Sequence, residues 1–382
     1  MNKIVKTITH LSDLHCRNYN RKEEYYEQFK KFLKEQLKIK PDRIIITGDI
    51  LHNKGIGMSP ELIQMVSWFF RECSFISPLI ILVGNHDANL SNTDRLDGLS
   101  PIINALNIPD IWYFKESGNY NDVYDNNVVY CVWSCLEEQK TPQLKKYKEK
   151  YDPDNKKIYI TLFHGIVSGA KNDIGYQFSS SFDIINFSDS DLICLGDIHA
   201  HQMLELKEDN RTITAIYAGS FLSQNYSESN NKGYVLYRIK DKNNISYEFK
   251  KIDNDFGFYI IQLEGFDNLG KEKIEISKKP NLRILWSGKS NEYSSIRQNE
   301  IKNYYEQKYN PSSISVIFES TDNNSLMNIK DDKINNISNP EIQRKLILDF
   351  LIENGQLDNE ELEIEIEDSD DSEVKPLTFD SF

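Results

Sequence analysis

The strongest constraint in this sequence is an apolar run that ends abruptly in a glycine and three polar residues. The run spans residues 79–83 and is followed by Gly84, Asn85, His86 and Asp87. A short, continuous apolar run that stops at a glycine is typical of a strand buried on both faces. Polar groups at the carboxyl end of such a strand lie where open α/β sheets place their ligand sites.

The same pattern occurs four more times, after apolar runs near residues 8–11, 43–47, 158–163 and 192–195. The polar residues that follow these runs are Asp13 and His15, then Asp49, then His164, and finally Asp197 and His199. The two Asp-x-His pairs have an i, i+2 spacing, so on an extended strand end both members of a pair point the same way. Five strand ends therefore supply carboxylates, imidazoles and one amide oxygen.

These residue types suit a hydrolytic site with two metal ions, which needs about seven ligands. Carboxylate and imidazole together favour Mn²⁺, Fe²⁺ or Zn²⁺ over Ca²⁺. A single Asp-x-His pair occurs often by chance, and a lone histidine at a strand end is more often a satisfied polar residue than a ligand. The ordered set of five strand ends carries the prediction.

Composition narrows the class of protein. The 382 residues carry a net charge of −14. Ten of the acidic residues lie within residues 358–373. An acidic surface binds nucleic acid poorly, so any DNA contact would require bound cations or a partner. We find no signal peptide, no apolar run long enough to span a membrane, and five scattered cysteines, which together predict a reduced, intracellular protein, either cytoplasmic or in a nucleus or viral factory.

The pattern along the chain predicts several structural segments. Amphipathic helices are expected over residues 21–38 and from Pro60 onward, and a second sheet is expected from strands at 128–133, 212–217, 233–239 and 245–252. Residues 140–157 are basic and polar, and their charge favours a solvated loop or helix over a phosphate-binding surface. A strand, a helix and a strand at 283–286, 291–308 and 313–318 predict a small βαβ unit.

The expected domains are residues 1–257, a small domain at 258–320, a linker at 321–338, a helix at 339–355 and a disordered acidic tail at 356–382. The helix begins with a capping-box spacing and has one apolar face. It packs against its own chain or docks onto a partner, and the sequence leaves both alternatives open.

The ordered motifs resemble those of the calcineurin-like metallophosphoesterase superfamily over about residues 1–250. Within it, the chain is most similar to the SbcD-type DNA repair nuclease subunits, which act with an SMC-like, coiled-coil ATPase. The features that carry this closer resemblance are His52 three residues after Asp49, the segment 217–220, the small βαβ unit and the helix at 339–355. The resemblance implies an α/β fold, namely a two-sheet metallophosphoesterase sandwich flanked by helices, with a small C-terminal βαβ cap domain.

The resemblance also implies a role for each site residue. One metal ion would be held by Asp13, His15, Asp49 and His199, and the other by Asp49, Asn85, His164 and Asp197. His86 would not be a ligand but would protonate the leaving oxygen or stabilise the transition-state charge, with Asp87 orienting its ring. His52 would help to place the substrate phosphate. The expected cofactors are two divalent metal ions, with Mn²⁺ favoured.

The function implied is a nuclease, exo- or endonucleolytic, that acts on DNA ends during recombination and repair. Its expected partners are double-stranded DNA ends, hairpins or single strands, an SMC-like ATPase bound through residues 339–355, and a second copy of the chain in a homodimer; no membrane contact is expected. The alternatives are a phosphatase or small-molecule phosphodiesterase of the same superfamily, and a scaffold with an inactive site.

Two departures from the family pattern stand out. Asp197 occupies a position that usually carries histidine, and His201 lies close enough in sequence to substitute for it. We favour Asp197 with His199, because their offset from Gly196 matches the motif. Arg17 follows Cys16 where the repair nucleases usually carry Leu-Gly, and it is equally a candidate phosphate contact and an ordinary surface arginine.

Overall fold

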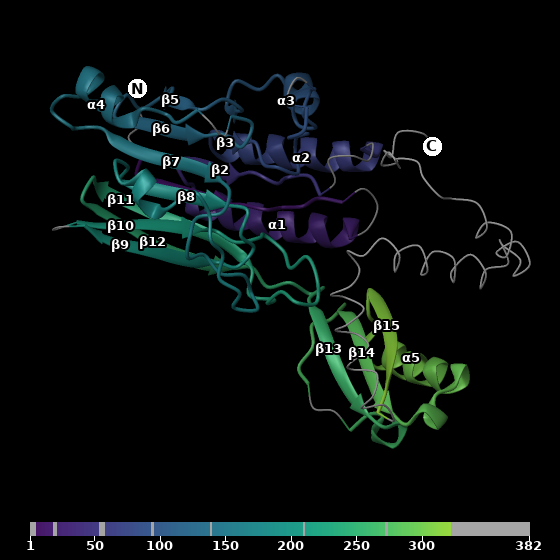
Figure 1. Cartoon of the computed structure of the whole chain (residues 1–382). Helices are drawn as coiled ribbons and strands as arrows, with labels where there is room; N and C mark the ends of the chain where they lie inside the picture. The colour runs from purple at the N-terminus through teal and green to yellow at the C-terminus, as the bar shows by residue number, and fades with distance from the viewer. Residues whose placement is uncertain are drawn as a thin grey trace, which may run out of the picture. The chain divides into compact units, whose positions relative to one another are not determined.

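A computed structural model describes residues 5–17, 21–52, 58–92, 95–137, 140–208, 211–271 and 274–321 (Figure 1). Nearly all of the predicted linker (321–338), the whole predicted docking helix (339–355) and the predicted tail (356–382) lie outside these residues. The described residues divide into two units, residues 5–286 with 294–317 and residues 287–293 with 318–321.

The first of two six-stranded sheets contains the first three predicted strands. Its spatial order is β12-β11-β1-β2-β3-β4, in which β1 to β4 run parallel. These strands are β1 (Thr7–Leu11), β2 (Arg43–Thr47), β3 (Leu79–Leu82), β4 (Ile111–Phe114), β11 (Gly233–Asp241) and β12 (Asn244–Lys251). The connecting helices are α1 (Lys22–Ile39), α2 (Pro60–Ile76) and α3 (Ser100–Leu106).

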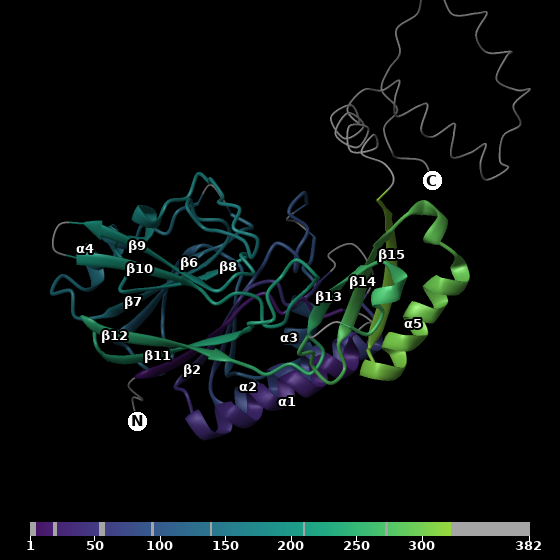
Figure 2. The same ribbon diagram turned by 90° about the horizontal axis from the view of Figure 1, so that it is seen from below.

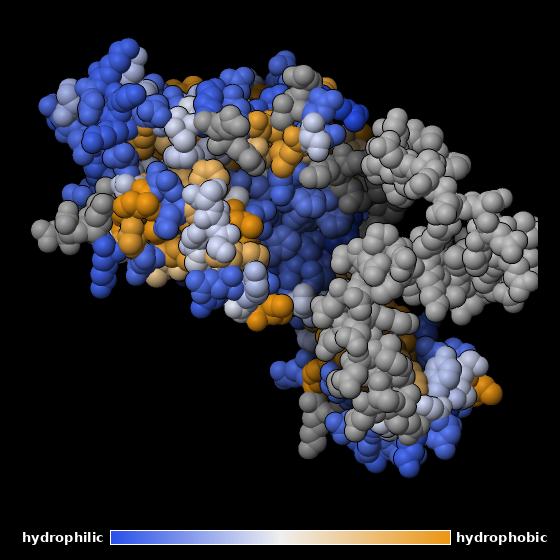
Figure 3. All heavy atoms as spheres, viewed as in Figure 1, coloured by the Kyte–Doolittle hydropathy of each residue, from blue (hydrophilic) through white to orange (hydrophobic). Residues whose placement is uncertain are grey.

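Helices α1 and α2 lie along one face of this sheet (Figure 2). The predicted start of α2 is confirmed, since the Ser59 hydroxyl accepts a hydrogen bond from the backbone N–H of Leu62 at 3.2 Å and Pro60 occupies the first turn. The exposed side chains of α1 are mainly charged and form part of the hydrophilic surface in Figure 3.

The second sheet has the order β5-β6-β7-β8-β10-β9, with four parallel strands in the middle. Its strands are β5 (Gly118–Asn121), β6 (Val128–Trp133), β7 (Ile158–His164), β8 (Leu192–Gly196), β9 (Gln202–Glu208) and β10 (Arg211–Tyr217). The short helices α4 (Leu144–Tyr151) and η1 (Ile184–Phe187) belong to its connections. The predicted sandwich of two sheets flanked by helices is therefore confirmed.

One part of the predicted topology is wrong. Residues 233–239 and 245–252 were expected in the second sheet, yet β11 and β12 extend the first sheet, where β11 pairs antiparallel with β1. The physical reason is that β1 would otherwise be an open edge with unpaired backbone groups. The apolar content of a strand shows that it is buried but not which sheet it joins.

Successive side chains of the central strands point to opposite faces of the sheet, so one apolar run contributes residues to two hydrophobic cores. Ile44 and Ile46 of β2 pack in the core beneath the helices, whereas Ile45 packs in the core between the two sheets. Leu79 and Ile80 of β3 divide in the same way. Both faces of these strands are therefore buried, as their continuous apolar sequences predict.

A separate three-stranded sheet has the order β13-β14-β15. It consists of β13 (Phe258–Glu264), β14 (Asn281–Gly288) and β15 (Ser313–Ser320), and α5 (Ser295–Tyr309) lies between the last two strands in the sequence. Trp286 of β14 and Ile301 and Tyr305 of α5 are fully buried. Among the described residues, no helix has the length and apolar character needed to cross a membrane.

Candidate metal centre

The carboxyl ends of five strands meet at one edge of the sandwich. In the first sheet, the side chains at these ends are Asp13 and His15 after β1, Asp49 after β2 and Asn85 after β3; in the second, they are His164 at the end of β7 and Asp197 and His199 after β8. Two contacts join the sheets here. Nδ1 of His164 donates to the carbonyl oxygen of Thr47 at 2.7 Å, and the backbone N–H of Asp197 donates to the Asp13 carboxylate at 3.1 Å.

Four of these residues have a backbone conformation that side-chain-bearing residues rarely adopt. The φ angles are 51° at Asp13, 47° at His15, 54° at Asp49 and 92° at Asp197. Elsewhere in the described residues, non-glycine residues with positive φ lie at helix ends or in a turn. Such conformations cost about 1–3 kcal/mol each and persist where the surroundings enforce them, often at functional sites.

Close backbone packing around Asp49 requires a glycine at position 84. A Cβ atom at Gly84 would lie 2.1 Å from the backbone nitrogen of Asp49 and 2.3 Å from its Oδ1. The glycine that opens the Gly84-Asn85-His86-Asp87 motif therefore allows β3 to approach the turn after β2. This contact places Asp49 where it faces both sheets.

The donor atoms form overlapping groups. Nε2 of His15 lies 3.5 Å from Oδ2 of Asp49 and 2.9 Å from Nε2 of His199, while Nε2 of His164 lies 3.2 Å from Oδ1 of Asp49. Asp13 belongs to the group around His15, since its Oδ1 is 3.9 Å from Nε2 of His15 and 4.0 Å from Nε2 of His199. Asp49 therefore lies between a group centred on His15 and a group centred on His164, the position that a bridging ligand requires.

The structure favours Asp197 over His201 as a candidate ligand. Oδ1 of Asp197 lies 3.8 Å from Nε2 of His164. The imidazole of His201 instead stacks on Phe249, with ring centroids 4.1 Å apart, and its Nδ1 bonds to the carbonyl oxygen of Tyr217 at 2.8 Å. His201 is thus engaged away from the other donor atoms.

The chemistry of the donor set fits divalent cations. Nδ1 of His164 donates to a carbonyl oxygen, so Nε2 is the ring nitrogen that faces the Asp49 carboxylate. Although burial opposes it, the negative charge of Asp49, Asp13 and Asp197 raises the pKa of His164 well above its ordinary value, and a bound cation would take the place of that proton. Nε2 of His164 and Oδ1 of Asn85 are both buried, and neither has a hydrogen-bond partner among the described residues. Burial raises the pKa of Asp13 to about 6 and also raises that of Asp197. Buried carboxylates, imidazole nitrogens and an amide oxygen gathered in one place are stabilised by bound cations.

Glu228 is a candidate functional residue that sequence reasoning missed. Its Oε1 lies 2.9 Å from Nδ1 of His199, and its Oε2 lies 3.2 Å from Nζ of the buried Lys232. Such a carboxylate fixes the tautomer of a ligand histidine, so that Nε2 is left for the metal. Ser220, from the predicted segment 217–220, supports the same loop, since its backbone N–H donates to the carbonyl oxygen of His199 at 3.0 Å. No local motif marks Glu228, because it lies 29 residues after His199.

His52 and His86 lie beside the His15 group. Nδ1 of His86 bonds to the carbonyl oxygen of His52 at 2.6 Å, and the two rings stack with centroids 6.1 Å apart. A ring nitrogen of His86 is also within 4.8 Å of donor atoms of His15 and Asp49, so proximity alone does not separate it from the ligands. Burial, followed by the positive charge of Arg17, lowers the pKa of His52 to about 4, which keeps its ring neutral at neutral pH.

The role expected for Asp87 is corrected. Its Oδ1 accepts from the backbone N–H of Leu51 and its Oδ2 from that of Gly84, both at 2.9 Å. Asp87 therefore joins the loops after β2 and β3, and the carbonyl oxygen of His52 is the group that orients the His86 ring. The resemblance implied a contact between Asp87 and His86, whereas the two oxygens of Asp87 accept from Leu51 and Gly84.

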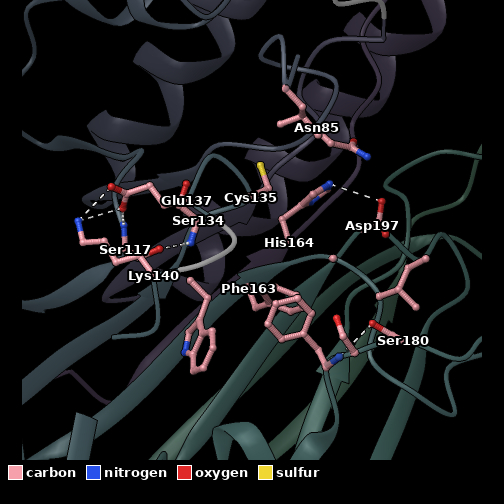
Figure 4. A pocket seen from close by; sticks show the side chains of 16 residues that line it. Asn85, Ser117, Ser134, Cys135, Glu137, Lys140, Phe163, His164, Ser180 and Asp197 are labelled. Atoms are coloured by element: carbon pink, nitrogen blue, oxygen red, sulfur yellow. Dashed lines mark hydrogen bonds and ion pairs between the residues drawn. The ribbon is translucent and has the colours of Figure 1, made fainter. Parts of the chain in front are cut away.

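Two cavities border the candidate ligands. One of about 280 Å³ has Asn85, His164 and Asp197 on one side, as Figure 4 shows. The other, of about 240 Å³, is lined by Asp197, His199 and Glu228 among others. The candidate metal centre is thus reached from two sides, with Asp197 between them.

Comparison with known proteins agrees with this geometry. Residues 6–201 match the calcineurin-like phosphoesterase family. The chain is 36% identical over 315 residues to the uncharacterized protein R555 of Acanthamoeba polyphaga mimivirus, an alignment that covers 80% of this chain and 22% of that protein. It is 26% identical over 341 residues to the DNA double-strand break repair protein Mre11 of Methanococcus maripaludis, with 87% of this chain and 82% of that protein covered.

The matched region thus spans about a fifth of the mimivirus protein and most of the archaeal one. The family match covers about half of the chain, including every candidate ligand named above. The chain belongs to the calcineurin-like phosphoesterase family.

Proposed function

We propose that this protein is a nuclease that uses two divalent metal ions to cut DNA at or near strand ends, in concert with an SMC-like ATPase. The observation that carries the proposal is the extent of the similarity to the archaeal repair protein. Because that alignment covers 87% of the chain, it continues past residue 257 into the segment that holds β13, β14 and β15. If the similarity reflected only the shared metal-binding residues, it would be expected to end near residue 201, where the family match ends.

The arrangement of side chains supports phosphoester hydrolysis. Asp13, His15, Asp49 and His199 would hold one ion, and Asn85, His164 and Asp197 would hold the other together with Asp49. When bound, such ions polarise a phosphoryl oxygen and lower the pKa of water, so that a nucleophile is available near neutral pH.

His86 supplies the proton in this proposal. Its Nδ1 is held by the carbonyl oxygen of His52, so Nε2 is the ring atom left to face the leaving oxygen. The ring of His52 is neutral, so it places no second positive charge beside His86. In this proposal the His52 ring also limits the positions that a substrate phosphate can take. Removal of a general acid of this kind typically lowers the rate by about 10²–10⁴-fold.

A phosphatase or small-molecule phosphodiesterase would use the same donor set. The observation that favours this second candidate is the cavity of about 280 Å³ beside His164, which has room for a single small ligand. The two candidates differ in substrate rather than in chemistry, so a comparison of substrates separates them.

The deciding experiment uses the whole chain with Mn²⁺ on linear duplex DNA, hairpin DNA and bis(p-nitrophenyl) phosphate. We expect cleavage of DNA, its loss in His86→Ala, and two bound Mn²⁺ ions in both proteins. His201→Ala is the matched control, because His201 lies outside the donor groups, and it should retain cleavage. Hydrolysis of the small diester with no cleavage of either DNA, even with an SMC-like ATPase present, would contradict the nuclease proposal.

The partners are part of the same proposal. The segment 339–355, which lies outside the described residues, would dock onto the ATPase, and two copies of the chain would form a dimer. Deletion of residues 338–382 should abolish co-purification with the ATPase while the hydrolysis of bis(p-nitrophenyl) phosphate continues. Light scattering of the intact chain would give the mass of a dimer.

A further inference from the structure

The cavity beside His164 has a chemical character that the metal chemistry does not use. Apart from Asn85, His164 and Asp197, its walls include three aromatic side chains, Trp133, Phe163 and Phe182. We call this cavity the aromatic pocket. At about 280 Å³ it lies near the lower limit of small-molecule sites, which begin at about 300 Å³, and so suits a group no larger than one or two rings.

The aromatic walls belong to a packed cluster of rings. The centroids of Phe163 and Phe182 are 4.9 Å apart, and Trp133 meets Phe182 edge to face at 6.0 Å. Phe187 completes the cluster, 5.3 Å from Phe163 and 5.1 Å from Trp133, but it does not line the aromatic pocket. Phe163 is buried, whereas Phe182 and Trp133 are partly exposed. The cluster therefore holds in place the rings that face the cavity.

A third part of the lining is polar, as Figure 4 shows for Ser117, Glu137 and Lys140. The Glu137 carboxylate accepts from the backbone N–H of Ser117 at 2.6 Å and pairs with Nζ of Lys140 at 3.0 Å. This wall offers a carboxylate acceptor and an ammonium donor side by side. A flat ring that stacks on an aromatic side chain can turn the donors and acceptors on its edge toward such a wall.

We infer that the aromatic pocket binds the nucleobase of the nucleotide whose phosphate lies on the candidate metal centre. The inference rests on the proposed function, since it assumes a nucleotide substrate. A base in the pocket would stack on the ring of Phe182 and direct its polar edge toward Glu137 and Lys140. Its 5′- or 3′-phosphate would then lie against Asn85, His164 and Asp197, which share the same cavity.

This site would favour nucleotides in general over one particular base. Every base has a stacking face, and an acceptor beside a donor can serve the edge of any of the four. Base stacking on one aromatic side chain is typically worth about tenfold in affinity. The pocket would therefore hold the end of a DNA strand in register and contribute little to the choice of sequence.

The test measures binding, so that it does not depend on turnover. Calorimetry with Mn²⁺ and the whole chain would compare deoxyadenosine 5′-monophosphate with 2-deoxyribose 5-phosphate, which has no base. We expect the nucleotide to bind about tenfold more tightly. Phe182→Leu should bring the two affinities together, and Phe182→Tyr should restore the preference.

Phe187→Leu is the matched control, because it makes the same change in the same ring cluster outside the pocket. It should keep the tenfold preference. Equal affinities of the wild-type chain for the two probes would overturn the inference, and so would an equal loss of preference in Phe182→Leu and Phe187→Leu.

A second arm separates this inference from the proposed function. Linear DNA with an abasic terminal nucleotide should show a KM about tenfold higher than intact DNA, with a smaller change in kcat. A preference for the mononucleotide without any DNA cleavage would reject the nuclease proposal and restrict the pocket to free nucleotides. DNA cleavage together with equal binding of the two probes would retain the nuclease and reject the base site.

Discussion

Replacement of Glu228 tests whether a residue far from every sequence motif tunes the metal centre. Burial would raise the pKa of Glu228, but the hydrogen bond with His199 and the charge of Lys232 outweigh it and lower the pKa to about 2. The carboxylate is therefore ionised at neutral pH and accepts from Nδ1 of His199 at 2.9 Å. It also accepts from the backbone N–H of Gln224 at 3.0 Å, so both of its oxygens are in use.

Glu228→Gln keeps the shape of the side chain but turns one acceptor into a donor. Either the hydrogen bond to His199 or one on the other oxygen is lost, and the negative charge behind the imidazole disappears. Loss of such support typically costs 10- to 100-fold in metal affinity, or about 1.4–2.7 kcal/mol. We expect one of two Mn²⁺ affinities to fall by this factor, while kcat at saturating Mn²⁺ changes little.

The assay is calorimetric titration of the chelator-treated chain with Mn²⁺, accompanied by thermal unfolding. Glu248→Gln is the matched control, since Glu248 lies on the surface of β12 and pairs with Lys250 and Arg238. It should bind Mn²⁺ like the wild type. Unchanged affinity in Glu228→Gln, or an equal loss in both variants, would refute the reasoning.

Two further predictions follow from the packing of the site and the core. Gly84→Ala places a methyl group 2.1 Å from the Asp49 backbone, so it should displace Asp49 and destabilise the fold by about 1–3 kcal/mol; Mn²⁺ binding as tight as in the wild type would contradict this. Burial lowers the pKa of His10 to about 3, so below pH 6.5 the unfolded chain binds a proton that the folded chain does not. His10 should therefore contribute a loss of about 1.4 kcal/mol of stability for each unit by which the pH falls between 6.5 and 3. The stability of His10→Gln, measured by urea unfolding, should lack this contribution, so an unchanged dependence on pH would argue against it.

Local sequence determined the elements of the site. Continuous apolar runs predict strands buried on both faces, and β2 and β3 bury alternate residues in two different cores. The donor residues could be found because each directly follows its strand, so a one-dimensional pattern carries the information. The ligand types and their order along the chain can therefore be read from the residues alone.

Pairing between distant segments cannot be read in the same way. Whether β11 joins the first or the second sheet depends on which edge it protects, and apolar content is the same in both cases. The roles of Asp87 and Glu228 depend on contacts with backbone and side chains that no motif records. The hydrogen-bond donors that contact a carboxylate are set by the fold, and they need not be its neighbours in sequence.

The sequence alone thus determined which ligand types the candidate metal centre contains, because these are residue types at strand ends. The tertiary structure decided what surrounds it. Asp197 lies beside His164 while His201 stacks on Phe249, because the turn after β8 directs these side chains to different places. The aromatic pocket exists because rings from β6, β7 and the chain before β8 meet next to that turn, and such a meeting is set by the packing of the second sheet.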